Sequence, residues 1–78
     1  MVREEFIDAL RTGREIEFTC HGKSYFESHE DNDKWYIYSE SEKTKQYFKS
    51  ANDFINNALI NGFPLNEMWS KIKIDYIL

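Results

Sequence analysis

Cysteine is nearly absent from the chain. Cys20 is the only one, and one thiol cannot close an internal disulfide. A domain of 78 residues without such a staple buries only about 60% of its extended surface, so its free energy of unfolding is small, about 5 kcal/mol. Six phenylalanines, five tyrosines and two tryptophans can compensate, because each buried ring removes about 150 to 250 Å² from water. We expect one compact domain over residues 1–78 with an aromatic core.

Long apolar runs and chain breakers are also scarce. No segment approaches the roughly 18 consecutive apolar residues of a membrane span, and no apolar run near the amino terminus precedes a small-residue cleavage site. One proline and three glycines, with no low-complexity tract or repeat, leave no candidate linker. These absences predict a cytoplasmic protein with no membrane partner.

Basic residues are fewer than acidic ones. Ten lysines and arginines against fourteen aspartates and glutamates give a net charge of −4, which repels phosphate backbones unless the cations gather on one face. The cations are scattered along the sequence, so we do not expect a nucleic-acid partner. Six acidic residues lie in the central third of the chain: Glu27, Glu30, Asp31, Asp33, Glu40 and Glu42. Such a cluster is either solvated around turns or imitates the phosphates of a nucleic acid.

The residue types that perform catalysis or bind metals are few and poorly spaced. Cys20 and His21 are adjacent, and neighbours on a strand point to opposite faces. A fourth donor at zinc spacing is missing even when His29 is counted. Three isolated glycines do not make a phosphate-binding loop. We therefore predict no enzyme activity, no catalytic residue, no cofactor and no metal, and we expect Cys20 to be a buried structural thiol.

The first part of the chain changes its hydrophobic period from 3.6 to 2. Val2, Phe6, Ala9 and Leu10 recur at helical spacing, with acidic residues early in the segment and Gly13 just beyond it, which predicts a helix of about three turns. From residue 15 apolar and polar residues alternate up to residue 20. This alternation is typical of a strand with one wet face.

A hairpin should follow, with its turn at His21-Gly22 and its second strand over residues 23–29. The register of this hairpin stays open. A two-residue loop places Phe18 opposite Tyr25, whereas a three-residue loop opposes Phe18 to Phe26 and turns Tyr25 outward. A slip of one residue exchanges the two faces of the strand.

The remaining elements are bounded by clearer turn and capping signals. E-D-N-D (residues 30–33) predicts a turn and K-W-Y-I-Y-S (34–39) a third strand, while Q-Y-F (46–48) is either a short fourth strand or an extended approach to a helix. Ser50 and Asp53 resemble a capping box at the start of a second helix, which we expect to end at Asn61-Gly62. Pro64 then begins a short helical turn, and residues 71–78 form a closing strand. The predicted fold class is α+β, with the order α-β-β-β-α-α-β.

The third strand raises the question of function, because it carries large side chains on both faces. If Trp35 and Ile37 face the helices, Tyr36 and Tyr38 lie on the other side of the sheet. Three explanations are open: tyrosines that sit acceptably on a half-wet sheet, a contact surface rimmed by acidic residues such as Glu27, or helices that cover both faces. The predicted partner-binding residues are Tyr25, Tyr36, Tyr38, Glu40 and Glu42.

Three runs carry a resemblance to known proteins: R-E-I-E-F-T-C-H-G-K-S-Y-F, D-K-W-Y-I-Y and P-L-N-E-M-W-S-K-I-K-I-D-Y-I. Together they resemble small uncharacterised proteins of low-GC Gram-positive bacteria and their mobile elements. The resemblance spans most of the chain and implies a helix that precedes a hairpin, with a closing strand of alternating isoleucines. It implies packing residues and carries over no activity.

These observations predict a module that binds another protein through an aromatic sheet face rimmed by acidic turns. One alternative is a homo-oligomeric structural protein, such as a homodimer whose sheets pair back to back or by the closing strand. The other alternative is an acidic inhibitor from a mobile element that mimics nucleic acid. All three rest on a core formed by Phe6, Phe18 and Phe54 that does not need Tyr36 and Tyr38.

Overall fold

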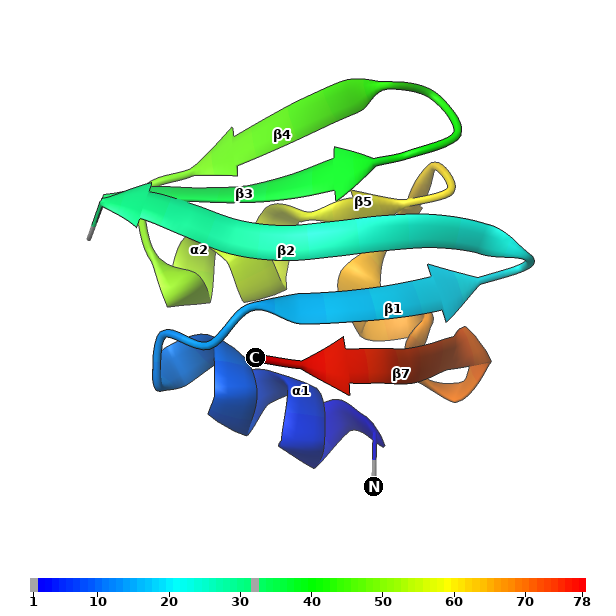
Figure 1. Ribbon diagram of the computed structural model, residues 1–78, viewed down its shortest axis with the longest axis horizontal. Helices are drawn as coiled ribbons and strands as arrows, with labels where there is room; N and C mark the ends of the chain where they lie inside the picture. The colour runs from blue at the N-terminus through cyan, green and yellow to red at the C-terminus, as the bar shows by residue number, and fades with distance from the viewer. Residues whose placement is uncertain (1, 32) are drawn as a thin grey trace.

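A five-stranded antiparallel sheet forms one layer of the molecule, and two helices with two short 3₁₀ turns form the other (Figure 1). The structure is a computed structural model that describes residues 2–31 and 33–78. The elements in chain order are α1 (Val2–Arg11), β1 (Ile16–Cys20), β2 (Lys23–Asp31), β3 (Lys34–Ser39), β4 (Thr44–Phe48), α2 (Ala51–Asn57), β5 (Leu59–Ile60), β6 (Phe63–Pro64), η1 (Leu65–Glu67), η2 (Trp69–Lys71) and β7 (Ile72–Ile77).

The strand order in the sheet is β4-β3-β2-β1-β7. The α+β class, the two helices and the antiparallel sheet are confirmed. The meander has four strands where three were predicted, because Q-Y-F belongs to β4 and pairs with β3 along its length. The closing strand β7 adds to the far edge of β1 as a fifth strand.

Of the two registers considered for the β1–β2 hairpin, the structure has the one with a two-residue turn. His21 and Gly22 have φ of 51° and 75°, the combination that a tight turn between right-twisted strands requires. Cys20 therefore pairs with Lys23, and Phe18 with Tyr25. The next turn, predicted at E-D-N-D, includes residue 32, which lies outside the described residues.

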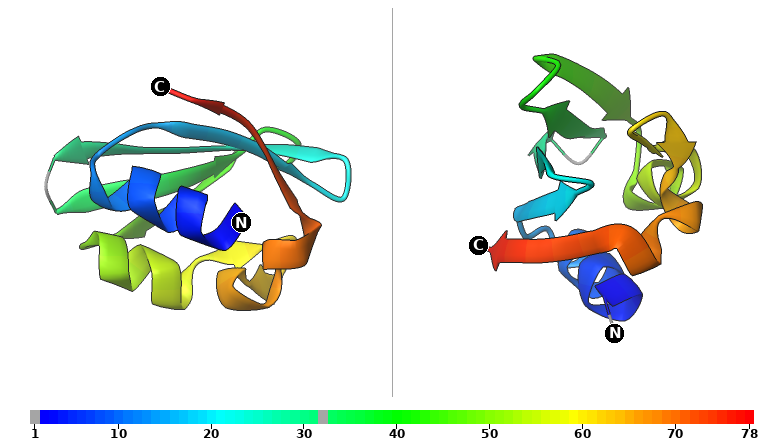
Figure 2. Two further views of the ribbon diagram at one scale, coloured as in Figure 1. Left: turned by 90° about the horizontal axis from the view of Figure 1, so that it is seen from below. Right: turned by 90° about the vertical axis from the view of Figure 1, so that its right-hand side faces the viewer.

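Both helices lie on the same side of the sheet (Figure 2). The 3₁₀ turns η1 and η2 lie on that side as well, beside the helices. The possibility that helices cover both faces is therefore wrong. One sheet face packs against the helical layer, and within residues 2–31 and 33–78 no helix lies over the opposite face.

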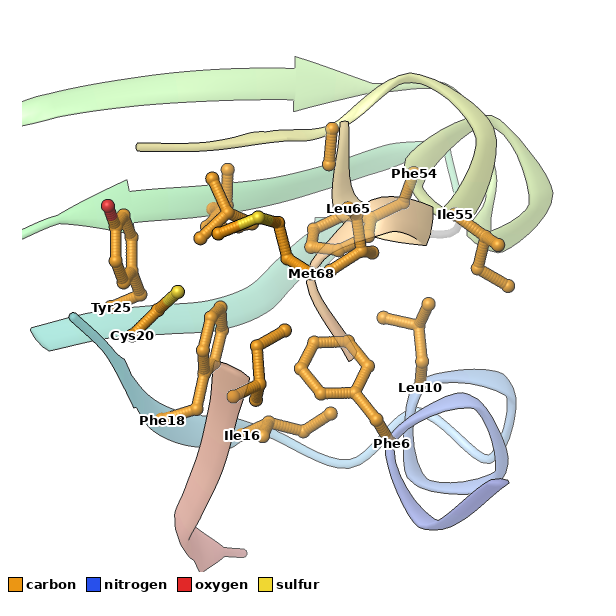
Figure 3. Packing of buried hydrophobic residues seen from close by; sticks show 14 of the residues in the cluster. Phe6, Leu10, Ile16, Phe18, Cys20, Tyr25, Phe54, Ile55, Leu65 and Met68 are labelled. Carbon is orange, nitrogen blue, oxygen red and sulfur yellow. The ribbon is translucent and has the colours of Figure 1, made fainter. Parts of the chain in front are cut away.

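The core lies between these two layers (Figure 3). Phe6 from α1, Phe18 from β1 and Phe54 from α2 are fully buried. The Phe6 ring meets the Phe18 ring edge to face at 5.1 Å between centroids, and lies 6.4 Å from the Phe54 ring. Tyr36 and Tyr38 are not members of this cluster, so the predicted core is confirmed.

Helix α2 is shorter than predicted. Its start is confirmed, because the Ser50 side chain accepts a hydrogen bond from the Asp53 N–H at 3.0 Å. The helix ends at Asn57, and Asn61-Gly62 forms the turn of the small β5–β6 hairpin instead of a helix cap. The cause lies in β4: the Gln46 side chain donates to the Leu59 carbonyl at 2.8 Å and accepts from the Leu59 N–H at 3.0 Å. This pair of bonds holds the chain extended at Leu59.

The closing strand also departs from its predicted alternation. A bulge in the β1–β7 pairing aligns Glu17 with Tyr76 but Phe18 with Ile74, so Asp75 is the extra residue and the alternation shifts by one. An unbroken alternation would put Tyr76 on the same face as Ile72 and Ile74. With the bulge, Tyr76 is instead 55% exposed, whereas Ile77 packs against the core. The Thr19 hydroxyl donates to the Asp75 carboxylate at 2.5 Å and ties the two strands together there.

Within residues 2–31 and 33–78, no helix is both long and apolar enough to cross a membrane.

Candidate functional site: an aromatic sheet face

Aromatic side chains line the sheet face that no helix covers. The alternation of side chains along each strand places five of them there, and we call them the ring face: Phe26, Tyr36, Tyr38, Tyr47 and Tyr76. They come from β2, β3, β4 and β7, so the ring face extends over most of the sheet. Tyr47 and Tyr76 are more than half exposed, and the other three are half-buried.

Several of these rings contact each other across neighbouring strands. The Tyr36 ring lies 6.5 Å from the Phe26 ring and 6.0 Å from the Tyr47 ring, between centroids. The Lys45 ammonium lies 4.5 Å from the centre of the Tyr36 ring, a distance at which a cation is attracted to the ring's electron-rich face. The rings thus support one another side by side without entering the core.

Two of the predicted contact residues, Tyr36 and Tyr38, lie on this face. Tyr25 does not, and its prediction as a surface residue is wrong: it is 4% exposed and stacks on Phe18 at 5.3 Å between ring centroids. The two-residue hairpin turn causes this, because it puts Tyr25 in phase with Phe18 on the helix side. Phe26 takes its place on the ring face.

Glu27 was expected at the rim of the contact surface and is instead fully buried. It faces the helical layer, between its strand partners Ile16 and Ile37, which are themselves buried. Neither carboxyl oxygen has a hydrogen-bond partner among the residues described. Burial, helped by the nearby Glu15 carboxylate, raises the pKa of Glu27 to about 8, so the side chain is predominantly protonated at pH 7.

The two remaining predicted residues have different positions. Glu40 follows the end of β3 and borders a hollow in the ring face. Glu42 lies two residues further along, in the turn between β3 and β4, where its N–H donates to the Ser39 hydroxyl at 3.3 Å. Both residues are exposed, but only Glu40 adjoins the rings.

The hollow has a volume of about 370 Å³. Its lining residues are Glu17, Phe18, Ser24, Tyr25, Phe26, Tyr38, Glu40 and Asp75. Ser24 is exposed although it lies on the middle strand of the sheet, because its small side chain does not fill the space between its larger neighbours. We call this feature the acidic hollow, since the three charged residues of its lining, Glu17, Glu40 and Asp75, are all carboxylates.

Sequence reasoning missed several members of this site. Tyr47 could have been predicted, since a strand at Q-Y-F places it beside Tyr36. Tyr76 could not, because the bulge at Asp75 reverses the orientation of Tyr76 and nothing in K-I-K-I-D-Y-I marks the position of that bulge. Glu17 was read only as part of the wet face of its strand, and its proximity to Asp75 follows from the pairing of β1 with β7.

Other chemistry has little support in the geometry. Cys20 is fully buried, as expected, and burial raises the pKa of its thiol. In the described part of the chain, no three side chains of histidine, cysteine, aspartate or glutamate form a group that could hold a metal ion. Comparison of the chain with protein-family models, curated proteins and solved structures found no match.

Proposed function

We propose that this chain is a cytoplasmic, non-catalytic module that binds another protein through its ring face. The observation that carries the proposal is the row of aromatic side chains on the one sheet face that the helical layer leaves uncovered. The solvated face of an antiparallel sheet is ordinarily polar. Tyrosine and phenylalanine are enriched in the centres of protein interfaces, where they contribute large contact areas at a low entropic cost.

The ring face can serve this purpose because the core does not depend on it. Phe6, Phe18 and Phe54 fill the space between the two layers. The ring-face side chains can therefore be buried against a partner without loss of the fold. The molecule has 4826 Å² of accessible surface. A standard interface covers about 800 Å² on each partner, roughly one sixth of that surface, which is compatible with one face of a sheet.

The test is the double substitution Tyr36→Ala with Tyr38→Ala. We expect circular dichroism to show a folded protein and affinity capture to lose the bound partner. The lysate should come from a low-GC Gram-positive bacterium, the group that the sequence resemblance indicates. Phe63→Ala is the matched control, since Phe63 is 54% exposed but lies on β6, away from the ring face.

Three outcomes contradict the proposal. If the double variant unfolds, the two rings belong to the core. If it retains the partner, the contact lies elsewhere on the molecule. If light scattering shows a stable dimer of the native chain that the double variant lacks, a second copy occupies the ring face.

A further inference from the structure

We infer that the occupant of the ring face is a basic segment of the partner protein, which places a lysine or arginine side chain in the acidic hollow. This inference rests on the proposed function and specifies the chemistry of the partner. It is carried by the charges around the hollow and by the rings beside them.

The charges in the hollow are of one sign. Glu17 from β1, Asp75 from the bulge of β7 and Glu40 at the end of β3 surround it, and its lining includes no lysine or arginine. Lys73 lies 3.8 Å from Asp75, but its side chain is largely exposed, so water screens this pair. For the part of the chain described, no ion pair to Glu17 or Glu40 is present. The carboxylates therefore attract a cation from outside.

The rings make the same hollow suitable for a long cationic side chain. Phe26 and Tyr38 lie opposite each other on β2 and β3 and both line the hollow. The faces of aromatic rings attract ammonium and guanidinium groups, and the alkyl stem of lysine or arginine packs well against apolar surface. Lys45 already contacts Tyr36 in this way on the same face.

A second copy of the chain satisfies these features less well. The chain has a net charge of −4, so two copies repel each other before they meet. A basic partner is instead attracted to the acidic hollow over a distance.

The first experiment uses small probes on the intact protein. Acetyl-lysine methylamide and acetyl-arginine methylamide, with a blocked α-amino group and a free side chain, are titrated into ¹⁵N-labelled protein. Acetyl-norleucine methylamide is the uncharged control. We expect the cationic probes to shift the amide signals of Ser24, Phe26 and Tyr38, with shifts that weaken in high salt. Equal shifts from the norleucine probe, or shifts confined to other residues, overturn the inference.

The second experiment removes the three charges. The triple variant Glu17→Gln, Glu40→Gln and Asp75→Asn keeps the size of each side chain and an oxygen that can accept the Thr19 hydrogen bond. Its matched control, Glu4→Gln, Glu5→Gln and Asp8→Asn, removes the same charge from the exposed face of α1. Affinity for the captured partner should fall about tenfold in the first variant and change little in the second.

The two proposals fail in distinguishable ways. If Tyr36→Ala with Tyr38→Ala abolishes binding while the hollow variant binds as well as the native chain, the ring face is a docking surface and the basic partner is wrong. If neither variant affects binding, the proposed function is wrong as well. A native dimer that the tyrosine substitutions dissolve identifies a second copy as the occupant and overturns the inference.

Discussion

Glu27 places a carboxyl group in the apolar layer, and its environment decides its protonation. Its strand partners Ile16 and Ile37 offer it no hydrogen bond, and the charged form cannot be solvated there. A buried carboxyl group avoids most of the desolvation penalty when it keeps its proton. Its pKa is therefore raised from 4.5 to about 8, which means that the folded chain favours the protonated form.

The contribution of Glu27 to the stability of the protein should therefore fall as the pH rises from 4.5 to about 8. Between pH 4.5 and about 8 the folded chain holds a proton on Glu27 that the unfolded chain has released. The free energy of unfolding then decreases with pH by up to about 1.4 kcal/mol per unit. The contribution of Glu27 is fully present below pH 4.5 and is lost once the pH exceeds about 8.

Glu27→Gln replaces the carboxyl group with an amide that does not titrate, so no proton is released at this position on unfolding. We expect its free energy of unfolding, measured in urea at several pH values, to depend less on pH than that of the native chain, and to gain on the native value toward pH 9. Glu17→Gln, on the exposed face of the neighbouring strand, is the control and should keep the native slope. Parallel pH profiles for the native chain and Glu27→Gln contradict the assignment.

Helix α2 depends on its first turn, because it has only seven residues. Its amino end is fixed in two ways: Ser50 accepts from the Asp53 N–H, and the Asp53 carboxylate accepts from the Lys49 N–H at 2.9 Å. The Lys49 N–H and the Asn57 side-chain amide both donate to that carboxylate and lower the pKa of Asp53. A short helix with few internal hydrogen bonds gains more from such capping than a long one.

Ser50→Ala should lower the free energy of unfolding by about 1 kcal/mol, a large share of the stability of a chain this small. Urea denaturation followed by circular dichroism measures the change. Ser50→Asp restores an acceptor at the cap and should recover most of the loss. Ser70→Ala, an exposed serine in η2, should have no measurable effect, and a loss equal to that of Ser50→Ala speaks against a specific capping role.

The sequence could predict elements whose signals are local. Helix α1, strand β3 and the capped start of α2 each follow from a period or a cap within the element. The end of α2 does not, because Ala58 and Leu59 fit a helical stripe and the competing bonds come from Gln46, thirteen residues earlier. Tyr76 depends in the same way on a bulge between two strands distant in sequence.

The site was predictable only in part, for the same reason. Tyr36 and Tyr38 follow from alternation within one strand. Tyr25 required a choice of register, and the correct choice turns Glu27 into the core, against the general rule that carboxylates stay exposed. That rule favours the three-residue loop, which would turn Glu27 outward but is not the register observed.

The molecule as a whole divides into a face that stabilises it and a face that does not. Phe54→Ala should cost about 3 to 5 kcal/mol, comparable with the total stability expected for this size, so the variant should be largely unfolded at 25 °C. Tyr47→Ala, on the ring face, should change the free energy of unfolding by about 0.5 kcal/mol or less. Circular dichroism with urea titration compares the two, and a large loss for Tyr47→Ala contradicts this division.

The pairing of β1 with both β2 and β7 has a consequence for synthesis on the ribosome. β1 emerges from the ribosome well before β7, yet its outer edge is paired by residues 72–77 of that later strand. Until those residues emerge, the nascent chain presents a row of unsatisfied backbone amides and carbonyls that other strands can join. Chaperone protection or rapid translation over this interval should therefore govern how much of the protein accumulates in a functional form.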